Sequence, residues 1–173
     1  MQRIKLWSTA LVAGLLIETG VAWTADVAET RDVLIRLHSV NQKEISMGRL
    51  AQKRAHTVEG KALAATIVDD HTALDEMVLA LARAEQIDLD TPIAAIKSAE
   101  AELADVAFDP TFDTRFARAA LDEDVRAITA VTAAHDASHD ARLRKLIDDA
   151  LPILRNDREL AQKILNATPR ALL

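Results

Sequence analysis

The sequence of 173 residues contains no cysteine and no tyrosine, and only 3% of its residues are aromatic. Without cysteine the chain cannot form disulfide bonds, thiolate metal sites or the thioether bonds that attach c-type haem. Any metal ligands must therefore be histidines and carboxylates. The formal net charge is −6, so the chain has neither the basic surface nor the aromatic platforms that nucleic-acid binding uses. We expect no nucleic-acid partner.

Glycine and proline are also scarce, with four of each in the whole chain. No segment shows the sustained alternation of apolar and polar residues that is typical of a half-buried strand. Half of the residues are apolar and 28% are charged, which is typical of a soluble globular protein. The length suits one domain with its own core. We expect a single all-α domain.

The first 25 residues have the pattern of a secretory signal peptide. Arg3 and Lys5 precede an apolar run over residues 6–17, and small residues follow it. This run is too short to span a bilayer, and no later stretch reaches the ~20 apolar residues of a membrane helix. The sequence predicts a signal peptide over 1–25, with a soluble, periplasmic domain over 26–173. The alternative is a buried N-terminal helix.

Capping residues and apolar spacing predict four long helices and one short helix in the connection between the second and third long ones. Thr57 and Thr91 have the character of N-cap residues, and Asp26 with Glu29 resembles a capping box. Short turns near residue 57 and over 135–139 make two antiparallel hairpins, and the long middle connection lets them pack together. We therefore expect an up-down four-helix bundle with helices over about 26–55, 58–81, 92–106, 110–131 and 140–166.

Two helices of this bundle carry polar residues on otherwise apolar faces. Asn41 and Glu44 face inward on the first helix, and His71 does so on the second. Glu44 lies about 19 Å and His71 about 21 Å along their helices from the turn near residue 57, and Asp124 lies about 18 Å from the turn over 135–139. With both turns placed at one end of the bundle, the three residues share a layer. Because imidazole and carboxylate groups can coordinate a metal ion inside a bundle, Glu44, His71 and Asp124 are the candidate ligands for one divalent ion.

An alternative gives the same residues a structural role. Glu44 and His71 would form a buried hydrogen-bonded pair that binds nothing, with Asn41 completing the hydrogen bonds. The Glu-x-x-His motifs of di-iron bundles are absent from residues 26–173, and no nucleophile with an adjacent base and no phosphate-binding loop is found. We predict no catalytic and no cofactor-binding residues. His38 and His56 are expected at the surface. Asp157 is expected about 10 Å from the Glu44 layer, either as a polar residue at the end of the bundle or in a second, separate polar contact.

The chain from Val40 to Leu165 resembles an uncharacterised family of exported bacterial proteins that are often labelled predicted outer membrane proteins. The resemblance implies a ferritin-like four-helix bundle. It also places Asp124 and Asp157 where that family usually has an Asp-His pair and a histidine. It rests on the following segments in this order: Asn41-Gln42-Lys43-Glu44, Gly48-Arg49-Leu50-Ala51, Val68-Asp69-Asp70-His71-Thr72, Phe112-Asp113 and Leu151-Pro152-Ile153-Leu154.

Two functions from different classes fit these observations. The first is an exported, non-enzymatic ferritin-like bundle that is related to stress or binds a small ligand or a protein. The second is a mononuclear metalloprotein that uses a His/carboxylate site in the bundle core. An interaction module for an amphipathic helix is a third possibility, which an exposed apolar groove would support.

Overall fold

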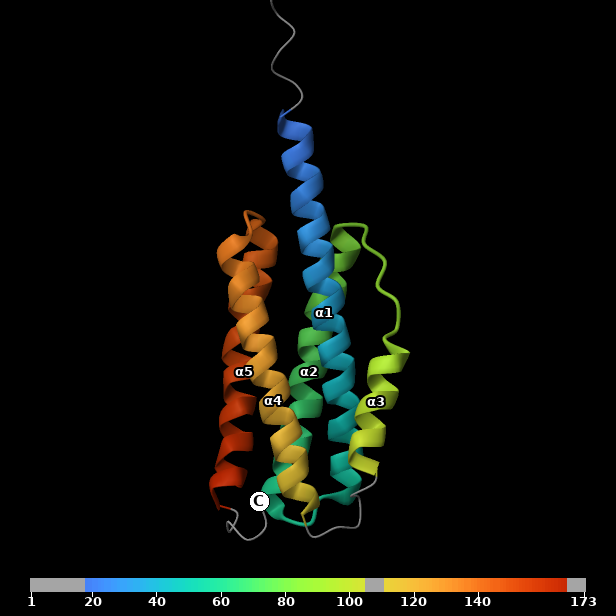
Figure 1. The fold of residues 1–173 in the computed structure, drawn as a ribbon, viewed down its shortest axis with the longest axis vertical. Coiled ribbons are helices and arrows are strands. Elements are labelled where there is room, and N and C mark those ends of the chain that lie inside the picture. The colour runs from blue at the N-terminus through green and yellow to red at the C-terminus, as the bar shows by residue number, and fades with distance from the viewer. Residues whose placement is uncertain (1–17, 105–110, 168–173) are drawn as a thin grey trace, which may run out of the picture.

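The computed structural model describes residues 18–104 and 111–167 and confirms an all-α bundle (Figure 1). Within these ranges there is no strand, and no helix has an apolar stretch long enough to cross a bilayer. Four helices are long, and the short one lies in the connection between the second and third of them. The helices are α1 (Glu18–Arg54), α2 (Val58–Ala84), α3 (Ile93–Ala104), α4 (Phe112–Ala137) and α5 (Ala141–Ala167).

The four long helices surround one core. Helix α1 packs against α2 and α4, and α5 packs against the same two helices, so α2 and α4 face each other across the bundle. Helix α3 lies outside this group and packs mainly on α1 (Figure 1). It runs back along the bundle after α2, so the chain returns to the end where α2 began before α4 starts. As a result α2 and α4 run in the same direction.

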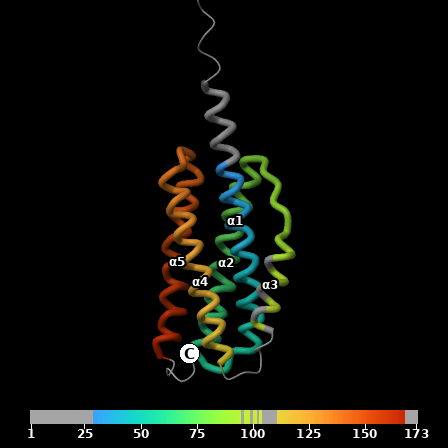
Figure 2. The backbone as a smooth tube through the Cα atoms, viewed as in Figure 1, coloured from blue at the N-terminus to red at the C-terminus, as the bar shows by residue number. Residues whose placement is uncertain are grey.

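This long connection places the two hairpin turns at opposite ends of the bundle, as Figure 2 shows. At the end with the α1–α2 turn, the carboxylate of Asp113 in α4 accepts hydrogen bonds from the backbone N–H groups of His56 and Thr57. At the end with the α4–α5 turn, Arg142 pairs with Glu85, which follows α2. Each turn is therefore tied to the hairpin on the other side of the bundle.

Most predicted helix boundaries are close to the observed ones. Thr57 is the N-cap of α2 and accepts a hydrogen bond from the N–H of Gly60 at 3.0 Å, as predicted. The capping box at Asp26 is wrong, because α1 already begins at Glu18. The predicted turn at 135–139 is too long, since α4 continues to Ala137. The helix start predicted at residues 109–110 and most of the predicted signal peptide lie outside the described residues.

Two groups of buried apolar side chains fill the bundle, one toward each end. The group at the α1–α2 turn includes Met47, Ile67 and Phe116, and the group at the α4–α5 turn includes Leu34, Leu74 and Leu154. Between the two groups, at the middle of the bundle, lie buried polar side chains from the four long helices. This gap in the core is the feature that suggests a function.

A strained residue follows α2 and offers a test of this end of the bundle. Gln86 has φ 58°, a left-handed conformation that glycine adopts more easily. We expect Gln86→Gly to raise the free energy of unfolding by about 1 kcal/mol, which urea denaturation will measure. The same change at exposed Gln52, inside α1, should instead destabilise by about 1 kcal/mol. A loss of stability in Gln86→Gly would contradict the strained conformation.

Candidate functional site

Five buried polar residues lie between the two apolar groups, and every long helix contributes at least one. We call them the polar layer: Asn41 and Glu44 from α1, His71 from α2, Asp124 from α4 and Asp157 from α5. Their exposed fractions are between 0% and 2%. Burial of polar groups is unfavourable unless each finds a partner, so their contacts decide what this layer does.

His71 makes the best-defined contacts of the layer. Its Nδ1 is hydrogen-bonded to Oδ1 of Asn41 at 3.0 Å. Its Nε2 lies 3.7 Å from Oδ2 of Asp157, which is too far for a hydrogen bond. Nε2 therefore has no hydrogen-bond partner. The imidazole is held on one side and open on the other, facing a carboxyl group.

Other atoms of the layer are also buried without hydrogen bonds. They include both carboxyl oxygens of Glu44, Oδ1 of Asp124 and Nδ2 of Asn41. The hydrogen-bonded pair of Glu44 and His71 considered from the sequence is thus not formed, and Asn41 holds the imidazole instead. Buried polar atoms without partners are rare in native proteins and indicate that a water molecule, a proton or an ion completes the site.

Burial strongly favours the neutral forms of the carboxyl groups. It raises the pKa of Asp124 to about 8, and the negative charge of Asp157 adds to this rise. It raises the pKa of Asp157 to about 7, with a further contribution from Asp70. It also raises the pKa of Glu44 well above its usual range, and the charge of Asp124 contributes again. Near neutral pH the layer therefore carries less negative charge than its three carboxyl groups would in water.

The imidazole of His71 is neutral at the same pH. Burial lowers its pKa to about 4, so its contact with Asp157 is not an ion pair at neutral pH. Positive charges lie nearby, because Lys43 lowers the pKa of Glu44 and Arg158 lowers that of Asp124. Lys43 also pairs with Glu123, which is bonded to Arg126 as well. The layer itself has no cation of its own.

The structure places Asp157 in this layer, and the prediction that it forms a separate contact is wrong. That prediction assumed both hairpin turns at one end of the bundle, whereas they lie at opposite ends. Counted from Ala167, at the end shared with the α1–α2 turn, Asp157 is about 15 Å along α5. This depth is close to that of Glu44. The signal in the sequence was its place on the apolar stripe that contains Leu154 and Ala161.

A second buried polar group lies beside the layer on α1 and α2. His38 Nδ1 is 2.7 Å from Oδ1 of Asp75, whose Oδ2 accepts a hydrogen bond from Gln42 at 2.7 Å. The prediction of an exposed His38 is therefore wrong, since its exposed fraction is 7%. The sequence signal was Asp75, one turn after His71 on the inner face of α2. All three residues have hydrogen-bond partners within the group, so we interpret it as a structural contact.

The predicted metal ligands are therefore brought to one layer, together with Asp157. Among the described residues, no three histidine or acidic side chains converge closely enough to hold an ion as they stand. Gly48 lies one turn after Glu44 on α1, at a close approach to α2. A Cβ there would lie 2.7 Å from Cγ2 of Val68, so this glycine lets α1 approach α2.

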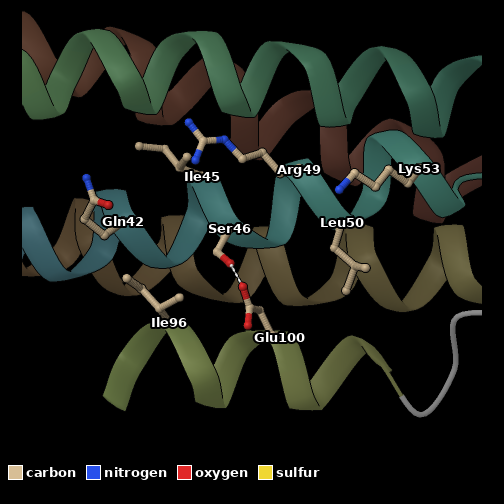
Figure 3. A pocket seen from close by; sticks show the side chains of 8 residues that line it. All are labelled: Gln42, Ile45, Ser46, Arg49, Leu50, Lys53, Ile96 and Glu100. Carbon is tan, nitrogen blue, oxygen red and sulfur yellow. Dashed lines mark hydrogen bonds between the residues drawn. The ribbon is translucent and has the colours of Figure 1, made fainter. Parts of the chain in front are cut away.

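A pocket between α1 and α3 lies on the other side of α1 from the polar layer. Its lining is mixed, with Ile45, Leu50 and Ile96 beside Arg49 and Lys53 (Figure 3). Ser46 donates a hydrogen bond to Glu100 at 2.7 Å across it. Gln42 closes one end of the pocket while it bonds to Asp75. No side chain of the polar layer lines this pocket, so it is a separate surface feature.

Comparison with known proteins gives a family but no characterised relative. Neither the curated proteins nor the solved structures contain a significant match to this chain. A family model described as Domain of unknown function (DUF4142) matches residues 18–164. This range includes every residue of the polar layer and all five helices except the last residues of α5. Since the match covers most of the 173 residues, the chain belongs to the DUF4142 family.

Proposed function

We propose that this protein is an exported, non-enzymatic helical bundle that binds one divalent metal ion in its polar layer. The observation that supports binding is the set of buried, unpartnered atoms on the long helices, above all Nε2 of His71 facing Asp157 and both oxygens of Glu44. A divalent cation would accept electron pairs from Nε2 of His71 and from the carboxyl oxygens of Glu44 and Asp157. In a purely structural core, apolar side chains would replace these polar atoms, or internal hydrogen bonds would pair them.

The donor types fit a metal ion. One neutral imidazole and three carboxyl groups make up the potential ligands: His71, Asp157, Glu44 and Asp124. His71 and Asp157 already face each other at 3.7 Å. Glu44 and Asp124 would have to turn toward them, since the side chains do not converge in the metal-free arrangement. A bound ion would also release the protons that these buried carboxyl groups hold.

Several features favour binding over catalysis. The layer is enclosed, with exposed fractions of 2% or less, which suits an ion better than an organic substrate. The pocket between α1 and α3 does not reach it. The ferritin-like character implied by the sequence agrees with one long connection between two hairpins, as in other bundles that hold metals in their cores.

Thermal melting in the presence of metal tests the proposal. We expect zinc or manganese to raise the melting temperature relative to a chelator, because an ion at 100 times its Kd stabilises the folded state by about 2.7 kcal/mol. His71→Ala should abolish this shift. His139→Ala, at an exposed position in the α4–α5 turn, should retain it. If wild type shows no shift and binds no metal in calorimetry, the layer is structural and the metal proposal is wrong.

The pH dependence of binding should follow the carboxyl groups. Above about pH 5 the imidazole is already neutral, because the pKa of His71 is about 4. The carboxyl groups of Asp157 and Asp124, with pKa values of about 7 and about 8, must lose their protons to bind an ion. We expect calorimetry to show affinity rising at least tenfold from pH 6 to pH 8. An affinity that stays constant from pH 6 to pH 8 would show that these carboxyl groups are already ionised, and would contradict this prediction.

Export is part of the proposal and rests on the first 25 residues. The basic start and the apolar run over 6–17 support a cleaved signal peptide. Expression with secretion should yield a periplasmic product that begins between residues 23 and 26, as intact mass will show. A product that begins at residue 26 lacks Trp7 and Trp23 and has no strong absorbance at 280 nm. A periplasmic species that retains residues 1–20 would contradict this reading.

A further inference from the structure

The contact between Asn41 and His71 carries information about the ion. Oδ1 of Asn41 is an acceptor, so at 3.0 Å the Nδ1 of His71 must be its donor. A neutral imidazole has one N–H, and with that hydrogen on Nδ1 the other nitrogen keeps its lone pair. Nε2, which faces Asp157, is then free to coordinate a metal ion.

Because this contact is buried, Asn41 remains the hydrogen-bond partner of the imidazole. Asn41 is 1% exposed and His71 is fully buried, so water cannot replace the asparagine as acceptor. In the reversed orientation of the amide, Nδ2 would donate to Nδ1 and leave the hydrogen on Nε2, directed at Asp157. That arrangement would occupy the open side of the ring. The orientation with Oδ1 toward His71 therefore leaves Nε2 free for a metal ion, whereas the reversed orientation would leave no free nitrogen.

Resting on the proposed function, we propose that Asn41 is a positioning residue that presents Nε2 of His71 to the ion, and that this makes the layer selective for zinc-like over alkaline-earth ions. Zn²⁺ and Co²⁺ accept imidazole nitrogen and are satisfied by four protein ligands. Ca²⁺ takes six to eight oxygen ligands, and Mg²⁺ keeps several water molecules. The enclosed layer offers one nitrogen and three carboxyl groups, all 2% exposed or less.

The selectivity has a second physical source. Where carboxylates are the only ligands of an ion, a hard cation such as Mg²⁺ or Ca²⁺ competes well for the site. Here the layer contains one imidazole, whose Nε2 faces Asp157 without a hydrogen-bond partner, and the bond from Nδ1 to Asn41 decides which nitrogen keeps its lone pair. Such outer contacts typically change metal affinity by about 10- to 100-fold when they are removed. Loss of the asparagine acceptor should therefore weaken the binding of zinc-like ions in particular.

The test uses the mature protein and Co²⁺, which reports its coordination through its visible spectrum. Wild type should bind one Co²⁺ with the intense absorption of a four-coordinate site, and Zn²⁺ should displace it, whereas Mg²⁺ and Ca²⁺ at millimolar concentration should not. Asn41→Leu should bind Co²⁺ about 10- to 100-fold more weakly. Asn41→Asp keeps an acceptor oxygen at the same place and should retain the affinity.

Each outcome has one meaning. If wild type binds neither Co²⁺ nor Zn²⁺, the proposed function and this inference both fail. If wild type binds them but Asn41→Leu binds equally well, only the positioning role fails, and if Mg²⁺ or Ca²⁺ competes equally, only the selectivity fails. A measurement on metal-free wild type remains decisive if Asn41→Leu does not fold. Long-range ¹⁵N–¹H correlation should show His71 protonated on Nδ1, and a proton on Nε2 would overturn the role of Asn41.

Discussion

Metal-free protein should lose stability as the pH rises from 6 to 9. In the unfolded chain Asp124 and Asp157 are ionised throughout this range, with ordinary pKa values near 4. In the folded protein burial raises these values to about 8 and about 7, so the folded state holds protons that the unfolded chain has released. Stability is then lost progressively until the pH passes the folded-state pKa values.

The size of this loss follows from the two shifts. From pH 6 upward, stability falls over about two pH units until the folded-state pKa of Asp124 is reached, and over about one pH unit for Asp157. Each unit corresponds to about 1.4 kcal/mol of unfolding free energy per group. The expected decrease is on the order of 4 kcal/mol, or about 10 °C in melting temperature. Glu44 acts in the same direction. His71 opposes this loss slightly, because between pH 6 and 7 the unfolded chain, with an ordinary histidine pKa of about 6.5, still binds a proton that the folded state does not bind.

Thermal melts in a chelator at several pH values will measure this dependence, and a matched pair of variants isolates its source. Asp124→Asn removes the buried ionisable group, so it should flatten the profile and raise the melting temperature at pH 9. Asp122→Asn removes the same charge from an exposed position on the same helix and should leave the profile unchanged. A melting temperature that rises from pH 6 to 9 would show that the buried carboxylates are already ionised and compensated.

Asp113→Ala should strongly destabilise the protein, although Asp113 lies outside the polar layer. The carboxylate of Asp113 accepts hydrogen bonds from the backbone N–H groups of His56 and Thr57 and from the hydroxyl group of Thr57, at 2.9, 2.7 and 2.5 Å. It joins the start of α4 to the α1–α2 turn. Its loss leaves these part-buried donors unpaired, and bonds to charged groups are worth about 1.5–3 kcal/mol each, so we expect a total loss of about 3–5 kcal/mol.

Urea denaturation at pH 7 will measure the loss, with Asp122→Ala as a control that should change stability by less than about 0.5 kcal/mol. Asp113→Asn keeps one acceptor oxygen and should fall between the two. The hydrogen bonds lower the pKa of Asp113, so this stabilisation is present above the unfolded pKa near 4 and disappears as the pH falls below it. Equal stabilities of Asp113→Ala and Asp122→Ala would contradict the role of this carboxylate.

Much of the fold could be predicted from the sequence because it depends on local signals. The apolar stripes and the cap at Thr57 set the helices, and the same stripes identified Glu44 and His71 as inward-facing polar residues. Asn41 was found in the same way, although its role as the partner of His71 was not. Spacing along one helix is fixed by its geometry, which is why these predictions succeeded.

What failed depended on how the hairpins are placed relative to each other. The depth of Asp157 could not be predicted without the path of the chain through α3, because that path decides which end holds the α4–α5 turn. His38 looked like a surface residue because its partner Asp75 lies on another helix. Asp113 gave no signal of its own, since the amides that it binds belong to a turn 56 residues earlier.

The position of the polar layer between two apolar groups has a consequence for how the helices align. A slip of one helix by a single turn, about 5.4 Å, would move its polar side chain among leucine and phenylalanine side chains and bring apolar groups against the remaining carboxyl groups. Apolar side chains alone tolerate such shifts, whereas one buried polar position is enough to fix the register of a helical assembly. The layer that makes the bundle sensitive to alkali therefore also restricts its four long helices to one alignment.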